Sequence, residues 1–85
     1  MAADKTLTEE DALVILRHGE DLIIAWPTSS IHYATVLNYQ HNDPHSFALT
    51  KMTWAQAEQE FISSIRNGWT VTKWPHNWRD WREVP

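Results

Sequence analysis

The strongest fold signal in the chain is the stretch Thr53-Trp-Ala-Gln-Ala-Glu-Gln-Glu-Phe-Ile-Ser-Ser-Ile-Arg-Asn-Gly68. Thr53 and Gln56 have the spacing of a capping box, in which each side chain bonds to the other residue's backbone N–H. Behind this cap, apolar residues recur at helical spacing, at Trp54, Ala57, Phe61, Ile62 and Ile65. Because Gly68 ends the pattern, the stretch predicts an amphipathic helix with one face against a core.

Three β-rich segments precede this helix. Residues 21–26 and 31–39 contain many β-branched and aromatic side chains and flank the turn sequence Pro27-Thr-Ser-Ser30, which predicts a hairpin. A second turn, Gln40-His-Asn-Asp-Pro-His45, leads to a third strand over residues 46–52. Consecutive strands that are joined by short loops favour an antiparallel meander.

Further helices are predicted at both ends of the chain. Thr8 is followed by three acidic residues, which suit the positive end of a helix dipole, and Gly19 supplies a stop after the apolar residues 12–16. In the tail, Pro75 accompanies three tryptophans at i, i+4 and i+7, which predicts a short amphipathic helix or turn; they are Trp74, Trp78 and Trp81. In a domain this small, we expect Trp74 and Trp78 to belong to the core.

These elements define the expected fold. It is an α+β fold in the order α-β-β-β-α, with a three-stranded antiparallel sheet, both main helices on one face, and a short Trp-rich helix or turn at the C-terminus. We expect residues 1–85 to form a single domain, with residues 1–7 as a flexible N-terminus.

Composition excludes several function classes. Cys is absent and the two Gly residues are both expected at helix ends, which leaves no disulfide framework and no phosphate-binding glycine loop. No catalytic nucleophile or acid pair stands out. His41 and His45 bracket a turn, but the five His residues lack the spacing of zinc ligands, so both are expected to be polar loop residues. We therefore expect no enzyme activity, no cofactor and no metal.

The charge balance argues against nucleic acid as a direct ligand. The chain has 7 basic and 11 acidic residues and a formal net charge of -4, whereas phosphate backbones are bound by clustered Lys and Arg. Double-stranded RNA-binding domains share the order α-β-β-β-α, but their second helix begins with basic residues, and this one is acidic. No apolar run approaches the roughly 20 residues that span a bilayer, and no signal peptide is visible, so we expect a cytoplasmic protein.

Two acidic loops are the candidate binding site. Glu20 and Asp21 follow the expected first helix, and Asn42 and Asp43 occupy the turn before the third strand, so both loops are expected at one end of the domain. Carboxylates that project from turns resemble a pair of phosphates and can fill an arginine-lined groove. Plain turn chemistry and a solvated helix exit explain the same residues without a binding role.

Three features of the chain together resemble a known family. They are the segment Phe61-Ile-Ser-Ser-Ile-Arg-Asn-Gly-Trp69, the turn Asn42-Asp43 before a short strand, and the acidic Glu20 after the first helix. Over about residues 11–69 the chain resembles the small phage anti-CRISPR proteins that inhibit type II-A CRISPR nucleases by mimicking DNA. The resemblance implies that the acidic loops occupy the site where nuclease arginines read the protospacer-adjacent motif. Pro44, His45, Ser46 and the Trp-rich tail depart from the family pattern, and the family is acidic at the position of Ser46 and in the tail.

The leading hypothesis is a phage or mobile-element inhibitor that binds a CRISPR effector nuclease in the bacterial cytoplasm, as a monomer or weak dimer, and blocks DNA engagement. The predicted partner-binding residues are Glu20, Asp21, Asn42, Asp43, His45 and Trp81. The alternative is a small protein- or peptide-binding accessory domain that uses its sheet face or its Trp-rich tail. A third hypothesis is a binder of single-stranded nucleic acid that stacks bases on the late Trp and Arg residues.

Overall fold

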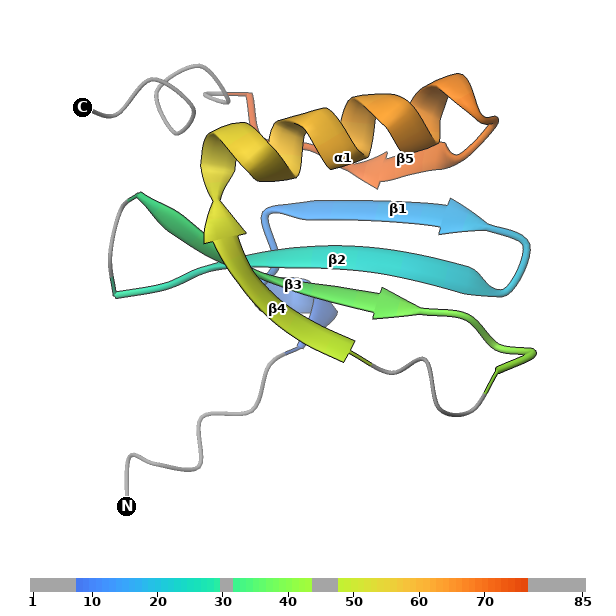
Figure 1. Cartoon of the computed structure of the whole chain (residues 1–85), viewed down its shortest axis with the longest axis horizontal. Coiled ribbons are helices and arrows are strands. Elements are labelled where there is room, and N and C mark those ends of the chain that lie inside the picture. Colours follow the sequence, from blue (N-terminus) through green and yellow to red (C-terminus); the bar gives the residue numbers. More distant parts are fainter. Residues whose placement is uncertain (1–7, 30–31, 44–47, 77–85) are drawn as a thin grey trace.

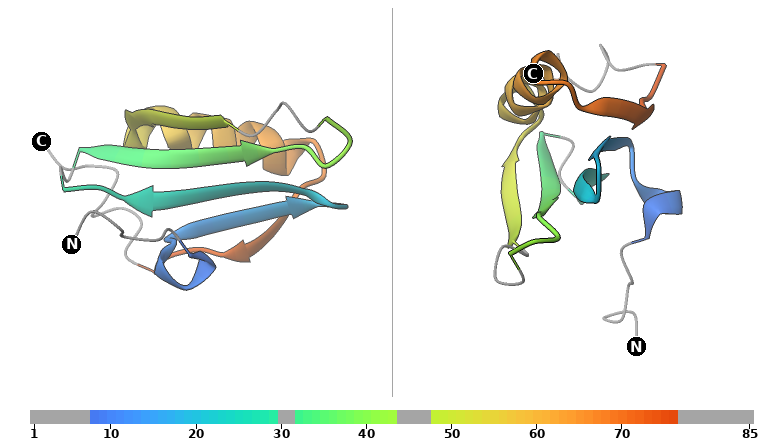
Figure 2. Two further views of the ribbon diagram at one scale, coloured as in Figure 1. Left: turned by 90° about the horizontal axis from the view of Figure 1, so that it is seen from below. Right: turned by 90° about the vertical axis from the view of Figure 1, so that its right-hand side faces the viewer.

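The structure, a computed structural model, describes residues 8–29, 32–43 and 48–76. These residues form a five-stranded antiparallel sheet in the spatial order β4-β3-β2-β1-β5, with a single α-helix across one face (Figures 1 and 2). The α+β class is therefore observed, but most of the regular structure is strand. The expected order α-β-β-β-α is wrong, and so is the packing of two helices on a three-stranded sheet.

The elements follow one another along the chain with short connections. After the 3-10 helix η2 (Glu9–Asp11), the strands β1 (Val14–His18) and β2 (Asp21–Pro27) form a hairpin, and β3 (Tyr33–Tyr39) and β4 (Ala48–Thr53) extend it as a meander. The helix α1 (Trp54–Arg66) follows β4 directly, and β5 (Thr70–Lys73) returns to pair with β1. The expected meander of residues 21–52 is thus confirmed, although it continues at one side into two further strands.

The segment expected as the first helix is instead the strand β1, which lies between β2 and β5. A strand with neighbours at both edges and packing on both faces is apolar at successive positions, and Val14, Ile15 and Leu16 are all buried. A short apolar run of this kind does not distinguish a buried strand from a helix. The cap at Thr8 does form, because its hydroxyl oxygen accepts a hydrogen bond from the Asp11 N–H, but it caps only the 3-10 turn η2.

Gly19 forms a hairpin turn and not the predicted helix stop. It has φ +63 and makes, with Glu20, the connection between the paired residues His18 and Asp21. Among the described residues only glycines have positive φ, so Glu20 does not. A positive φ at the first turn position alone is the pattern of a type II′ turn, for which glycine is preferred.

The helix predicted from the capping box is confirmed as α1. The Gln56 N–H donates to Thr53 Oγ1 at 3.1 Å, and the Thr53 N–H donates to Gln56 Oε1 at 3.2 Å. Gly68, with φ +95, follows the end of the helix. The next segment is the strand β5, which the sequence does not predict, and the expected tail helix around Trp78 and Trp81 falls outside the described residues. Within the described ranges, no helix is long and apolar enough to cross a membrane.

Apolar clusters lie on both faces of the sheet. On the face covered by α1, Trp54 and Phe61 pack with alternate strand residues, namely Val14, Leu16, Ile23, Ala25, Ala34 and Val36. Trp69 and the expected core residue Trp74 are partly buried against the same cluster. The opposite face carries a second cluster, which contains Ile15, Ile24, Trp26 and Leu37. The sheet is therefore a central layer with apolar packing above and below it.

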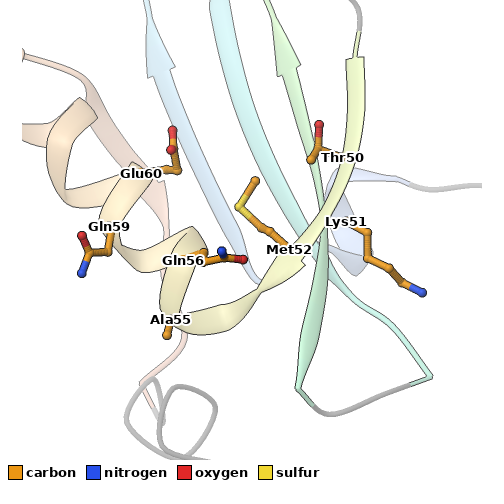
Figure 3. A pocket seen from close by; sticks show the side chains of 7 residues that line it. All are labelled: Thr50, Lys51, Met52, Ala55, Gln56, Gln59 and Glu60. Atoms are coloured by element: carbon orange, nitrogen blue, oxygen red, sulfur yellow. The ribbon is translucent and has the colours of Figure 1, made fainter.

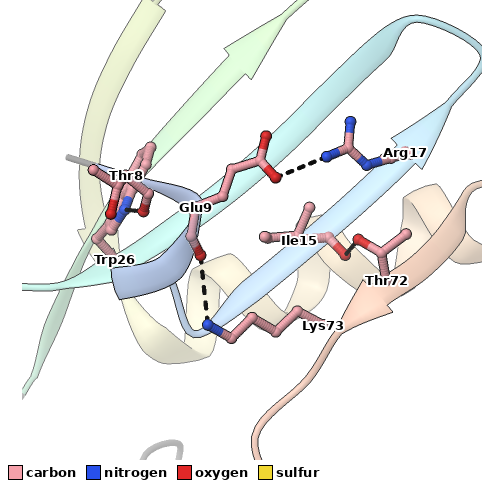
Figure 4. Close-up of polar contacts among 7 residues, drawn as sticks. All are labelled: Thr8, Glu9, Ile15, Arg17, Trp26, Thr72 and Lys73. Atoms are coloured by element: carbon pink, nitrogen blue, oxygen red, sulfur yellow. Dashed lines mark hydrogen bonds and ion pairs between the residues drawn. The ribbon is translucent and has the colours of Figure 1, made fainter.

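Polar contacts fasten η2 to the strands (Figure 4). The Trp26 indole Nε1–H donates to the Thr8 carbonyl at 2.6 Å, and Arg17 of β1 forms an ion pair with Glu9 at 2.8 Å. The Lys73 ammonium of β5 donates to the Glu9 carbonyl at 3.4 Å. The Glu9 carboxylate is thus part of a structural contact with β1.

The packing of α1 predicts different effects for two neighbouring residues. Phe61→Ala should lower the free energy of unfolding by about 3–5 kcal/mol, because it opens a cavity at a fully buried side chain. Ile62→Ala should cost no more than about 1 kcal/mol, because Ile62 is 40% exposed. Urea unfolding followed by tryptophan fluorescence measures both changes. Equal losses in the two variants would contradict the observed orientation of α1.

Candidate functional site

One end of the sheet carries both acidic loops. The β1–β2 turn and the loop that follows β3 lie at this end in Figure 1, and the register pairs Leu22 of β2 with Tyr39 of β3. The residues just before Leu22 therefore lie beside those just after Tyr39. We call the residues at this end the acidic tip, which consists of Glu20, of Asp21 at the start of β2, and of the loop residues His41, Asn42 and Asp43.

Asp21 links the two loops of the acidic tip. Its Oδ1 accepts a hydrogen bond from the backbone N–H of His41 at 3.1 Å. The His41 ring lies between two carboxylates, with Nδ1 at 3.5 Å from Asp21 Oδ1 and Nε2 at 3.9 Å from Glu20 Oε2. The Asp43 N–H donates to the Gln40 carbonyl at 3.1 Å, which closes the second loop as a turn. The bond from His41 to Asp21 holds the backbone of the second loop beside the first.

The acidic tip is negative and accessible. Glu20, Asn42 and Asp43 are exposed, and Asp21 is half-buried. The tip contains three carboxylates and no Lys or Arg. Ionised carboxylates accept strong, often bidentate, hydrogen bonds from guanidinium groups. The arrangement is therefore suited to arginine side chains of another molecule.

The structure brings together four of the six predicted partner-binding residues, namely Glu20, Asp21, Asn42 and Asp43. The reason for their proximity differs from the expected one, because Glu20 lies in a hairpin turn and not at the end of a helix. The other two predicted residues, His45 and Trp81, fall outside the described residues. His41 is not among the predicted residues, although its backbone makes the contact between the loops.

One sequence signal would have identified the role of His41. If Gly19-Glu20 is taken as a two-residue hairpin turn, then β2 begins at Asp21, directly beside the loop that ends β3. His41 then becomes the neighbour of an acidic side chain. The metal hypothesis gains no support from this proximity, since no group of three or more His, Asp or Glu residues within 8–29, 32–43 and 48–76 is arranged to hold an ion.

The link between the loops predicts a specific loss of protection. Asp21→Ala removes the acceptor of the His41 N–H, so amide hydrogen exchange at His41 should become about tenfold faster or more. Asp21→Asn keeps a carbonyl oxygen at this position and should exchange at a rate close to that of the unmodified protein. Hydrogen exchange followed by NMR measures both rates. Equal exchange at His41 in all three proteins would contradict the Asp21 link.

In comparisons with known proteins, no protein-family model, curated protein or solved structure matches the chain.

Proposed function

We propose that this domain is a non-catalytic protein that binds another protein through the acidic tip and competes with nucleic acid for a basic surface. The observation that supports the proposal is the bond from the His41 backbone to Asp21. It joins loops from two different turns, so that carboxylates distant in the sequence project from one end of the sheet.

The physical advantage of this arrangement is preorganisation. A flexible acidic loop loses conformational freedom when it binds, and this loss reduces the affinity. Here the turn between β1 and β2 closes a pair of hydrogen-bonded strands, and the backbone just after β3 bonds to it through Asp21. The carboxylates also attract basic surfaces at long range, which raises the rate of association.

The specific partner suggested by the sequence resemblance is a type II-A CRISPR effector nuclease. In this version the chain is a phage or mobile-element DNA mimic that acts in the cytoplasm of a bacterial host, and the acidic tip occupies the arginines that read the protospacer-adjacent motif. The α-β-β-β-α order that the sequence patterns predict is wrong. The charge of the acidic tip therefore supports a basic, nucleic-acid-binding partner in general. A nuclease in particular is favoured only by the loop residues that match the family.

A cleavage assay tests the nuclease version. The purified protein should reduce DNA cleavage by a guide-loaded type II-A nuclease, and Asp43→Asn should weaken the inhibition by about ten- to a hundredfold, because it removes one charged hydrogen-bonding partner worth about 1.5–3 kcal/mol. Glu10→Gln is the matched control. It removes an acidic charge from η2, outside the acidic tip, and should inhibit as the unmodified protein does.

The outcomes of this assay are distinct. Undiminished cleavage by several type II-A nucleases at large excess of the protein contradicts the nuclease version. Loss of inhibition in Asp43→Asn together with an equal loss of folding stability would assign Asp43 a structural role.

A second candidate function is the accessory protein-binding domain, and the sheet face opposite α1 favours it. Tyr33 is 41% exposed and Leu49 is 54% exposed. The register places Leu49 opposite Leu37, which belongs to the apolar cluster of that face. Contiguous exposed apolar patches, rather than single exposed apolar side chains, mark protein-binding surfaces. If Leu49→Ser abolished binding of a partner and Asp43→Asn did not, the sheet face would be the interface.

A further inference from the structure

A groove lies between the outer edge of β4 and the helix α1 (Figure 3). It has a volume of about 600 Å³ and is lined by Thr50, Lys51, Met52, Ala55, Gln56, Gln59 and Glu60. β4 is the last strand at its side of the sheet, and no described strand pairs with its outer edge. The groove therefore has a strand edge as one wall and a helix as the other.

The ladder between β3 and β4 determines which backbone groups of β4 face the groove side. In an antiparallel ladder, residue pairs that exchange hydrogen bonds alternate with pairs that do not. The Trp54 N–H donates to the His32 carbonyl at 3.1 Å, which continues the register of β3 and β4 by one residue. The bonded positions of β4 are thus Met52 and Thr50. The N–H and C=O groups of Leu49 and Lys51 consequently point away from β3.

Thr53 provides an independent check of this assignment. By the same alternation its N–H points away from β3, and it donates to the Gln56 side chain of the capping box. The start of α1 therefore uses the last outward N–H of the strand. Leu49 and Lys51 remain as open positions with the two-residue spacing that an added strand requires.

The side chains of the groove indicate what kind of ligand fits. Figure 3 shows Met52 directed toward α1 and Lys51 directed away from it. Met52 and Ala55 offer apolar contacts, and Glu60 forms no ion pair with any residue that the structure describes. A Lys or Arg side chain matches these residues, because its apolar stem suits Met52 and Ala55 and its positive head suits Glu60.

We propose that the groove binds an extended peptide of a partner protein by β-strand addition, with a Lys or Arg side chain of the peptide lying between Met52 and Glu60. Hydrogen bonds to Leu49 and Lys51 hold the main chain of the peptide, and alternate peptide side chains enter the groove. This site shares no residue with the acidic tip, so it goes beyond the function proposed above and does not depend on it.

A foreign peptide fits this edge better than a second copy of the chain does. If two β4 strands paired about a two-fold axis, the copy would present Thr50 and Met52 on the side of α1, and Glu60 would gain no cation. A peptide with a basic residue on the side of α1 supplies the cation that a second copy does not place beside Glu60.

The test begins with the selection of random peptides displayed on phage against the full chain. The strongest binder is then synthesised with one backbone nitrogen methylated at a time, and each affinity is measured by calorimetry. Methylation should weaken binding about tenfold or more at alternate positions of the bound segment and have little effect in between, because only alternate N–H groups face β4. The selected sequences should be enriched in Lys or Arg at a position that faces the groove.

Variants of the protein test the two parts of the site separately. Lys51→Pro removes an outward N–H without removing a bond to β3, so it should abolish peptide binding, whereas Lys51→Ala keeps the N–H and should bind. Glu60→Gln should reduce the affinity for the basic peptide about tenfold. Asp43→Asn in the acidic tip should leave this affinity unchanged, which separates the groove from the function proposed above.

Three outcomes overturn the proposal. The first is a selection that enriches no peptide. The second is a methylation profile without the two-residue period. The third is undiminished binding by folded Lys51→Pro protein. If Lys51→Pro fails to fold, the methylation profile of the peptide decides the question alone.

Discussion

The packing of Trp54 and Phe61 against the sheet is the constraint on which the rest of the structure depends. The chain has no Cys for disulfides, and α1 is the single α-helix of the described residues, so these two side chains supply the bulk of the covered face. Trp54 is only 1% exposed although it directly follows the last residue of β4. The helix must therefore begin at the edge of the sheet and run back over it. The groove beside β4 is a direct consequence.

Local signals predict the middle of the chain and fail at one side of the sheet, where β1 and β5 lie. The strands β2, β3 and β4 and the helix α1 have turn sequences, alternation or a capping box between residues 21 and 68. The strand β1 has an apolar run that suits a helix equally well, since it is buried on both faces. The strand β5 has four exposed residues and no apolar pattern, and only its pairing with β1 defines it. Pairing between segments so distant in the sequence produces no periodic pattern of apolar residues in either segment.

The two candidate surfaces differ in how far the sequence predicts them. The acidic tip depends on loops that flank neighbouring strands. A correctly predicted meander therefore brings Glu20 and Asp43 close together, even when the strand β1 before it is wrongly predicted as a helix. The groove depends on strand order, because β4 is the outer strand only when β1 and β5 are added at the opposite side of the sheet. A three-stranded sheet with two helices on one face has no unique helix-lined edge. The groove can therefore be identified only from the tertiary structure.

The binding proposed for the acidic tip and the binding proposed for the groove both require a partner with positive charge. The acidic tip offers carboxylates at the ends of β2 and β3, and the groove offers Glu60 beside an open strand edge. A protein with a basic nucleic-acid-binding surface and an extended basic segment can engage the two surfaces at once. Occupation of one surface then raises the effective concentration of the partner at the other, so that two modest contacts give tight binding.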